Sequence, residues 1–285
     1  MKDDTLSRRN FLKRNLAVSV GSLLGLPVLA YDGKNEIRQV HQAVRKKEWR
    51  NRQRGMTYRR FGNTGMMVSE IVQGTAMWEN QSHLDTFESA FEKGVNYIDV
   101  APAYKNGRSE RLVGKYLKDS GKRDKLFLSN KIRFYDEYLV GLMNDVLKSL
   151  PEGKRKVLRK QADDLIEHRG VLKPGYHIDY WPRQTDKLYL TYLRYVVFKE
   201  YGGLNKHKGQ IKKHMHQLVE DSRQAVGTEY FDVLHCPHGV AMPEMLESEN
   251  IREVLAELKS SGKIRFSAVS MHNDVVGRKV SLNSL

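Results

Sequence analysis

The sequence contains little cysteine and lacks any long apolar run. Cys236 is the only cysteine among 285 residues. This excludes a disulfide framework within the chain, an iron–sulfur cluster and a cysteine-rich zinc site. No apolar run reaches the roughly 20 residues that a membrane span needs, so a multi-pass membrane protein is excluded. Apolar residues make up 40% of the chain, which is enough for a core, and global disorder is therefore not expected.

Acidic residues are also in short supply relative to basic ones. The chain has 49 Lys and Arg against 34 Asp and Glu, which gives a formal net charge of +15. Such an excess could attract a polyanion or an anionic envelope surface. The densest basic run, 45–54, lies in a basic leader over residues 31–55. We expect this leader to form a solvated helix packed loosely on the domain, with surface binding as the alternative.

Residues 1–30 resemble a twin-arginine export signal. Ser7–Lys13 holds a serine, two arginines, a phenylalanine, a leucine and a lysine in the order that this signal uses. A moderately apolar stretch follows and ends at Val28–Ala30, with a small residue where a signal peptidase would cut. The resemblance implies export of an already folded protein to the periplasm or cell envelope of a bacterium, with the export machinery as a partner. An ordinary secretory signal or a short membrane anchor is the alternative.

From residue 56 the apolar pattern alternates between short strands and helices. Glycines at 94, 227 and 262 follow three of the helices, as expected for helix ends. The alternation implies parallel strands joined by right-handed crossovers, in either an open doubly wound sheet or a (β/α)8 barrel. The expected strands are 70–75, 96–100, 125–130, 230–234 and 264–270, and the expected helices are 82–93, one from 109, 211–225 and 251–258.

Two features narrow this choice. The dinucleotide-binding pattern G-x-G-x-x-G, which would favour the doubly wound sheet, is missing, because Gly74 stands alone after the first strand. Residues 134–205 interrupt the alternation, and we expect them to form an insertion with its own helices. Its tyrosines lie among basic residues and could stack on nucleobases, but packing within the protein is the favoured interpretation. No specific nucleic-acid partner is therefore expected.

Several segments together resemble the aldo/keto reductases. Tyr58–Glu70 is similar to the opening hairpin and first barrel strand of that family, Asn96–Glu110 to its second strand and loop, Arg123–Lys131 to its third strand, and Gly262–Ser270 to its fifth. The resemblance covers residues 56–131 and 206–275. No single motif decides it, but the order and spacing of the segments are specific.

The resemblance implies an α/β fold of the (β/α)8 TIM-barrel type. Residues 56–285 would form its N-terminal part, about five of eight βα units, with the insertion 134–205 after the third strand. Because the chain ends at Leu285, just after the fifth strand, we expect it to be the front part of a longer protein or a truncated product. A truncated chain would bind NADP(H) poorly.

The implied function is that of an exported oxidoreductase that transfers a hydride between NADP, or NAD, and a small-molecule carbonyl or alcohol. A tyrosine, with an ordinary pKa of about 10, is a weak acid at neutral pH, and a nearby cation favours the loss of its proton. The resemblance makes Tyr104 the general acid, Lys131 its cation and Asp99 the partner of that lysine. The three would meet because barrel strand ends converge on one face.

The resemblance also implies cofactor contacts. Gly74 and Thr75 would lie under the nicotinamide beside Asp99, and Ser270 would bond its carboxamide. Met271 stands where many of these reductases have asparagine, which removes one expected contact with the cofactor.

A histidine would orient the carbonyl, and two are available. His238 is the better match by the residues that follow it, and His235 is the alternative. The family usually places its histidine five residues after the strand aspartate, here Asp232, but that position is Pro237. His238 comes one residue later, so a β-bulge would have to absorb the extra residue.

Neither pair of neighbouring histidines, His235 with His238 or His214 with His216, has a third ligand, so no metal site is expected. The alternative function is a non-catalytic barrel-type binding protein at the cell envelope, derived from a truncated or degenerate reductase.

Overall fold

The computed structural model of the chain describes residues 28–31, 37–40, 45–132, 135–173 and 183–271. The chain divides into two compact units, one formed by Met1–Trp49 with Arg59–Met67 and the other by Arg50–Tyr58 with Val68–Leu285. The export signal predicted for residues 1–30 lies outside the described residues except for its last three, which begin a strand.

Short β-strands make up the described N-terminal part. The pairing of β1 with β2 is antiparallel, and that of β3 with β5 is parallel. β4 lies beside β5 on the side away from β3, and the 3-10 turn η1 connects β4 to β5. These elements are β1 (Val28–Tyr31), β2 (Ile37–Val40), β3 (Glu48–Trp49), β4 (Tyr58–Arg60), η1 (Gly62–Thr64) and β5 (Met66–Ser69).

The helix predicted for the basic leader is wrong, because residues 45–55 contain β3 and no helix. Arg50 and Asn51, which belong to the larger unit, make hydrogen bonds within it. The Asn51 amide donates to the carbonyl oxygens of Phe91 and Val95 at 2.6 and 3.1 Å, and Asn96 donates to the Arg50 carbonyl at 2.8 Å. Partners distant in the sequence therefore hold Arg50 and Asn51 in place.

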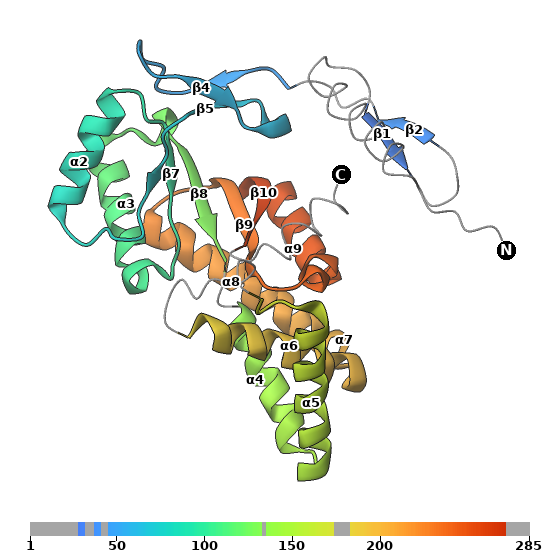
Figure 1. Cartoon of the computed structure of the whole chain (residues 1–285). Helices are drawn as coiled ribbons and strands as arrows, with labels where there is room; N and C mark the ends of the chain where they lie inside the picture. Colours follow the sequence, from blue (N-terminus) through green and yellow to red (C-terminus); the bar gives the residue numbers. More distant parts are fainter. Residues whose placement is uncertain (1–27, 32–36, 41–44, 133–134, 174–182, 272–285) are drawn as a thin grey trace. The chain divides into compact units, whose positions relative to one another are not determined.

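Five parallel strands form the centre of the larger unit (Figure 1). Their order in space is their order in the chain, as in a barrel, and the described strands form an open sheet with β6 and β10 at its edges. The strands are β6 (Gln73–Gly74), β7 (Tyr97–Asp99), β8 (Phe127–Lys131), β9 (Phe231–Val240) and β10 (Ile264–Met271). The predicted parallel α/β arrangement is confirmed, but the first strand is shorter than the predicted 70–75 and the fourth is longer than 230–234.

Helices connect successive strands, close to the predicted positions. In the first of them, Leu84, Phe87 and Phe91 recur at helical spacing and are buried. The ring of Phe87 packs against Trp78 and Tyr116 at centroid distances of 5.7 and 5.0 Å. These connecting elements are α2 (Gln81–Glu92), η2 (Tyr104–Gly107), α3 (Arg108–Ser120), η3 (Arg123–Lys125), α8 (Lys208–Val226), η4 (Pro243–Glu247) and α9 (Glu249–Ser260).

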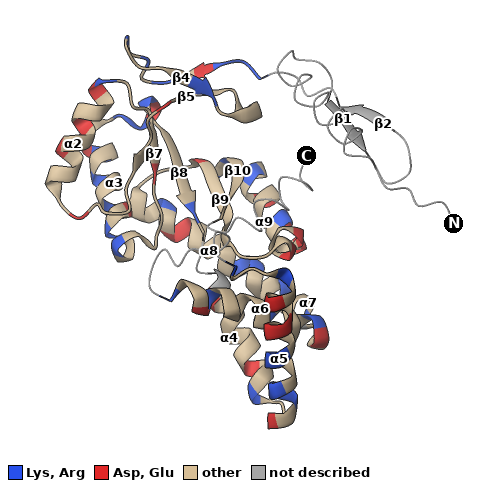
Figure 2. Cartoon of the chain, in the orientation of Figure 1, with Lys and Arg blue, Asp and Glu red and all other residues tan. Residues whose placement is uncertain are grey.

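The predicted insertion is helical, as expected. It forms α4 (Tyr135–Lys148), α5 (Glu152–Arg169), α6 (Gln184–Tyr201) and α7 (Gly203–Lys206), of which α4, α5 and α6 lie side by side (Figure 1). Its apolar side chains share one buried cluster with α8 and β9, as Met143, Tyr192, Met215 and Leu234 illustrate. Acidic and basic side chains are interspersed along α5 (Figure 2). Among the described residues no helix is long and apolar enough to cross a membrane.

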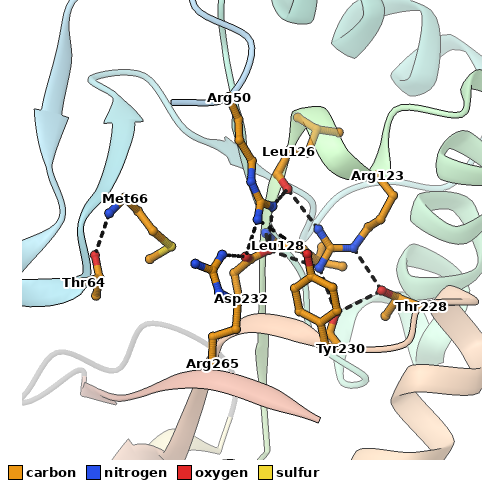
Figure 3. A network of polar contacts seen from close by, with 10 residues as sticks. All are labelled: Arg50, Thr64, Met66, Arg123, Leu126, Leu128, Thr228, Tyr230, Asp232 and Arg265. Carbon is orange, nitrogen blue, oxygen red and sulfur yellow. Dashed lines mark hydrogen bonds and ion pairs between the residues drawn. The ribbon is translucent and has the colours of Figure 1, made fainter. Parts of the chain in front are cut away.

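A buried carboxylate joins the N-terminal ends of three strands (Figure 3). Asp232, the second residue of β9, has a fully buried side chain. Its oxygens lie 3.2 Å from Arg50, 3.1 Å from Arg123 and 2.5 Å from Arg265, and one of them accepts the backbone N–H of Leu128 at 3.0 Å. The network ties the segment that begins at Arg50 to β8, β9 and β10.

Candidate active site

Strand register puts the candidate polar residues on one face of the sheet. Asp99 of β7 pairs with Ser129 of β8, and two residues further along β8 the pairing is between Lys131 and His235 of β9. Because side chains alternate between faces with a period of two, residues 129 and 131 point to the same side. Their cross-strand partners Asp99 and His235 share that side. The C-terminal ends of β7 and β8 and the middle of β9 therefore place a carboxylate, an ammonium and an imidazole on one face of the sheet.

Lys131 is the central contact of this group. Its ammonium nitrogen donates to Oδ2 of Asp99 and, at 2.8 Å, to the phenol oxygen of Tyr104. The nitrogen also lies 4.9 Å from the centroid of the Tyr104 ring. The Ser129 hydroxyl donates to the other oxygen of Asp99 at 2.6 Å. The structure thus assembles Asp99, Tyr104 and Lys131, as the sequence predicted, and adds Ser129.

The loop that carries Tyr104 has a strained backbone. Lys105 and Asn106 follow it in left-handed conformations with φ of 50° and 51°, which cost non-glycine residues energy, and Gly107 follows at 76°. The Lys105 ammonium forms an ion pair with Glu79 in the loop after β6. That contact lowers the pKa of Glu79. The backbone thus kinks directly after Tyr104, whose phenol lies on Lys131.

A second set of buried polar contacts supports the end of β8. The side-chain amide nitrogen of Asn130 donates to Glu110 of α3 at 2.9 Å, and the side-chain oxygen Oδ1 of Asn130 accepts the backbone N–H of Lys131 at 2.6 Å. Both Glu110 and Asn130 are buried. Burial raises the pKa of Glu110, and hydrogen bonds with Asn130 and Ser222 oppose that rise.

The predicted cofactor residues of the first strand lie beside Asp99. Gly74 is the cross-strand partner of Asp99, and nothing lies within 4 Å of where a Cβ on Gly74 would stand. Thr75 is buried, and its hydroxyl donates to the Asp99 carbonyl oxygen at 2.9 Å. The Ser109 hydroxyl lies 2.7 Å from the Thr75 hydroxyl. Thr75 therefore fixes the β6 end to β7 and α3, while Gly74 leaves open space at the sheet edge.

The two histidines occupy different positions. The register of β9 against β10 shifts between His235, opposite Ala268, and His238, opposite Ser270, so a bulge in β9 absorbs the extra residue. His238 is buried, and its Nδ1 forms a hydrogen bond with the Ser270 hydroxyl. The Ser270 hydroxyl, which was predicted to bond the cofactor carboxamide, is thus hydrogen-bonded to His238, which was predicted to be catalytic.

His235 is the histidine whose pKa is affected by the charges of Asp99 and Lys131. Burial lowers its pKa, the charge of Asp99 opposes this, and the charge of Lys131 adds to it. Its Nδ1 lies 3.4 Å from the Val269 carbonyl oxygen, a long contact that leaves the ring free to meet another partner. The structure therefore brings His235, the alternative candidate, next to Lys131, and pairs His238 with Ser270.

Sequence reasoning missed Ser129, Glu110, Asn130 and the Glu79–Lys105 ion pair. Ser129 had a local signal, because it lies two residues before Lys131 on the same strand and hence on the same face. Contacts such as Glu110 with Asn130 depend on how a helix packs on the sheet and have no such signal. Within the described ranges, no three His, Cys, Asp or Glu side chains come together as metal ligands would.

Comparisons with known proteins identify the family of the chain. The profile of the aldo/keto reductase family matches residues 70–278. The chain belongs to the aldo/keto reductase family. Aldo-keto reductase YhdN of Bacillus subtilis is 38% identical over 84 residues, 27% of this chain and 25% of that protein. Aldo-keto reductase AMT2 of Alternaria alternata is 23% identical over 226 residues, 75% of this chain and 49% of that protein.

Solved structures of the family show the same partial coverage. Aldo-keto reductase AKR11C1 from Bacillus halodurans matches with a TM-score of 0.44 and 22% identity, over 79% of this chain and 54% of that one. An aldo-keto reductase from Klebsiella pneumoniae, solved in complex with NADPH, matches with a TM-score of 0.39 and 19% identity, over 75% of this chain and 49% of that one. The chain spans about half the length of the relatives that match most of it.

Proposed function

We propose that this chain is an NADP(H)- or NAD(H)-dependent reductase that interconverts a small-molecule carbonyl compound and its alcohol. Membership of the aldo/keto reductase family implies an oxidoreductase. The observation that carries the proposal for this chain is the position of one ammonium group, Lys131, bonded to both the Asp99 carboxylate and the Tyr104 phenol. A structural ion pair would not need the phenol.

The acid–base chemistry follows from these contacts. When a carbonyl oxygen lies near the phenol, Tyr104 gives it a proton and becomes a phenolate. The Lys131 ammonium donates to that phenolate and stabilises its charge, and Asp99, held by Ser129, keeps the ammonium oriented. A proton from solvent then restores the phenol. In the reverse direction the phenolate accepts the alcohol proton.

Gly74 and Thr75 leave room for a nicotinamide ring beside Asp99, Tyr104 and Lys131. The space above Gly74 would be filled by the Cβ of any other residue, and it adjoins Asp99 across the strand pair. When bound there, the nicotinamide supplies or accepts the hydride, which carries the two electrons of the reaction. Gly74 would allow the ring to approach the sheet, and Thr75 holds the backbone beneath it.

We further propose that His235, not His238, orients the carbonyl. His235 is the cross-strand neighbour of Lys131 and responds to the charges of the pair. Burial lowers the pKa of His235 and so favours the neutral imidazole, which does not compete with Lys131 for the Asp99 charge. His238 is instead bonded to Ser270. His235→Ala should therefore lower kcat/KM more than His238→Ala.

Substitution of Tyr104 by phenylalanine tests the proposal, because it removes the proton donor and leaves the ring. Loss of a general acid is expected to lower kcat by about 10²- to 10⁴-fold in carbonyl reduction. Binding of NADPH, followed by fluorescence titration, should be unchanged. Tyr189→Phe is the matched control, since this tyrosine lies at the edge of the insertion core. Unchanged turnover in Tyr104→Phe would refute the proposal and is what a non-catalytic binding protein predicts.

Export is a separate proposal. We infer from the match of Ser7–Lys13 to a twin-arginine signal that residues 1–30 direct the folded chain to the periplasm or cell envelope, where its positive charge would favour an anionic surface. Replacement of both Arg8 and Arg9 by lysine should retain the protein in the cytoplasm with residues 1–30 uncut, as measured by cell fractionation and intact mass. Export of this variant at the wild-type level would refute the proposal.

A further inference from the structure

A cavity of about 450 Å³ lies between the insertion and the segment that follows β9. Helices α4, α6 and α7 form one side, and η4 with the beginning of α9 forms the other. This volume falls in the range of small-molecule sites. The lining contains none of Asp99, Tyr104, Lys131 and His235. The cavity is therefore separate from the candidate active site.

Part of the cavity lining is apolar and adaptable. Leu139, Phe198, Met242 and Met245 line it, and each is more than nine-tenths buried within the protein. The two methionines have flexible thioether side chains that adjust to ligands of different shape. Together with the aromatic ring of Phe198, they provide a surface for the apolar body of a ligand.

Asn250 supplies a polar group to this lining that nothing in the chain uses. It is the second residue of α9 and is only 7% exposed. Within the described part of the chain its side-chain amide has no hydrogen-bond partner, yet its nitrogen and oxygen are not completely enclosed. Because Asn250 lines the cavity, the surface that its amide keeps opens there. Buried polar groups almost always have partners, and this amide can both donate and accept.

The other buried polar side chains of the lining are already engaged. Thr191 donates its hydroxyl to the Lys187 carbonyl oxygen at 2.9 Å. Arg194 has contacts of its own within the chain. The side-chain amide of Asn250 is therefore the buried polar group that remains for a ligand.

The charges of the lining favour a neutral ligand. The lining holds three acidic residues, Glu244, Glu247 and Glu249, and two basic ones, Arg194 and Lys199. This excess of acid disfavours an anion. A cation finds no unpaired buried carboxylate either, because Arg169 binds Glu244 at 3.0 Å, Lys208 lies 4.0 Å from Glu249, and Glu247 is exposed. An uncharged ligand meets neither difficulty.

We propose that this cavity is a second ligand site that binds a small neutral carboxamide with an apolar or aromatic body. Nδ2 of Asn250 donates to the ligand carbonyl oxygen, and Oδ1 of Asn250 accepts the ligand N–H, so that the two amides pair edge to edge. The apolar body lies against Phe198 and the methionines. The proposal does not depend on the reductase function, because no residue of the two sites is shared.

Binding of 2-naphthamide to the full chain, measured by isothermal titration calorimetry, tests the proposal. Methyl 2-naphthoate is the neutral comparison, since it keeps the ring and the carbonyl but has no N–H, and 2-naphthoate is the anionic one. We expect saturable one-to-one binding, with the amide at least fivefold tighter than either comparison. Asn250→Leu should bring the amide to the affinity of the ester. Asn144→Leu, which changes an exposed asparagine of α4 outside the lining, should leave the preference unchanged.

Two further variants keep the test decisive if Asn250→Leu does not fold. Asn205→Trp places a large ring at an exposed position of the cavity lining and should block naphthamide without disturbing the core. Tyr104→Phe should bind naphthamide as the wild type does. Equal affinity for amide and ester in the wild type, or unchanged binding in Asn205→Trp, would overturn the proposal. Loss of binding in Tyr104→Phe would place the ligand in the candidate active site and overturn it as well.

Discussion

Replacement of Asp232 by asparagine should destabilise the protein strongly. The carboxylate is fully buried, and three arginines and one backbone N–H contact it (Figure 3). Asparagine has nearly the same volume, so the change removes the charge and one acceptor oxygen without opening a cavity. The arginines remain charged, since a guanidinium does not lose its proton in proteins. The variant therefore retains buried positive charge without its counter-charge.

The magnitude depends on how far water can reach each arginine. Removing one partner of a buried ion pair costs about 3–5 kcal/mol. The side chains of Arg50, Arg123 and Arg265 are 9, 19 and 31% exposed, so water can partly solvate the latter two. Arg50 is the least accessible, and its guanidinium lies 4.4 Å from the centroid of the Phe127 ring. We therefore expect a loss near the lower limit, about 3 kcal/mol, out of a typical total of about 5–15 kcal/mol.

Urea unfolding followed by far-UV circular dichroism measures this loss. Asp119→Asn is the matched control, because Asp119 pairs with Lys115 one turn away and both side chains are more than half exposed. Such an exposed pair contributes about 0.3–0.5 kcal/mol. If Asp232→Asn lost no more than this control, the three arginines would not depend on the carboxylate, and the reasoning would be refuted.

Four further substitutions follow from the packing and from the burial of Glu110. Gly114→Ala in α3 should lower the free energy of unfolding by about 1–3 kcal/mol, because the new Cβ would lie 2.8 Å from the Val226 carbonyl oxygen. Gly141→Ala in α4 should raise it by up to about 1 kcal/mol, because no atom lies within 4 Å of the new Cβ. Urea titrations of the two variants should therefore shift in opposite directions. Met143→Ala should cost about 2–5 kcal/mol in the same titration, since that side chain is fully buried in the core that the insertion shares with the sheet. Because burial raises the pKa of Glu110 above 4.5, the folded state holds a proton that the unfolded state releases, so this contribution is present below about pH 4.5 and is lost as the pH rises. The unfolding free energy of the wild type should therefore fall between pH 4.5 and 7. Glu110→Gln should show a smaller fall when it is measured over the same range.

Local patterns predicted those parts of the fold that depend on local contacts. Leu84, Phe87 and Phe91 repeat at helical spacing, and the helix α2 that contains them buries all three. Gly227, predicted to end a helix, does so in the left-handed conformation, with φ of 64°. These features need only neighbouring residues, so one sequence suffices to find them.

Features that depend on distant partners were not predictable in the same way. The run 45–54 has the charge of a solvated helix, yet Arg50 bonds to Asp232, 182 positions along the chain. The choice between His235 and His238 depended on whether a bulge interrupts β9, which the pairing with β10 determines. The end of β6 is likewise limited by its single neighbour β7, which it meets only at Gln73 and Gly74.

Under the proposed function, the two aspartates of the sheet differ in role according to their position along a strand. Asp232 lies near the N-terminal end of β9 among arginines, none of which can exchange a proton, so its carboxylate can only hold the structure together. Asp99 ends β7, is 23% exposed, and contacts an ammonium that also touches a phenol, a group able to give up its proton. In barrels of this type the C-terminal strand ends carry the chemistry and the N-terminal ends the stability. Asp99→Asn should accordingly lower kcat at least tenfold and change the unfolding free energy by about 1 kcal/mol or less, since water reaches its carboxylate. Asp232→Asn should show the reverse order, with the larger effect in urea titration. If kcat and the unfolding free energy fell in parallel in Asp99→Asn and Asp232→Asn, Asp99 would act through stability alone.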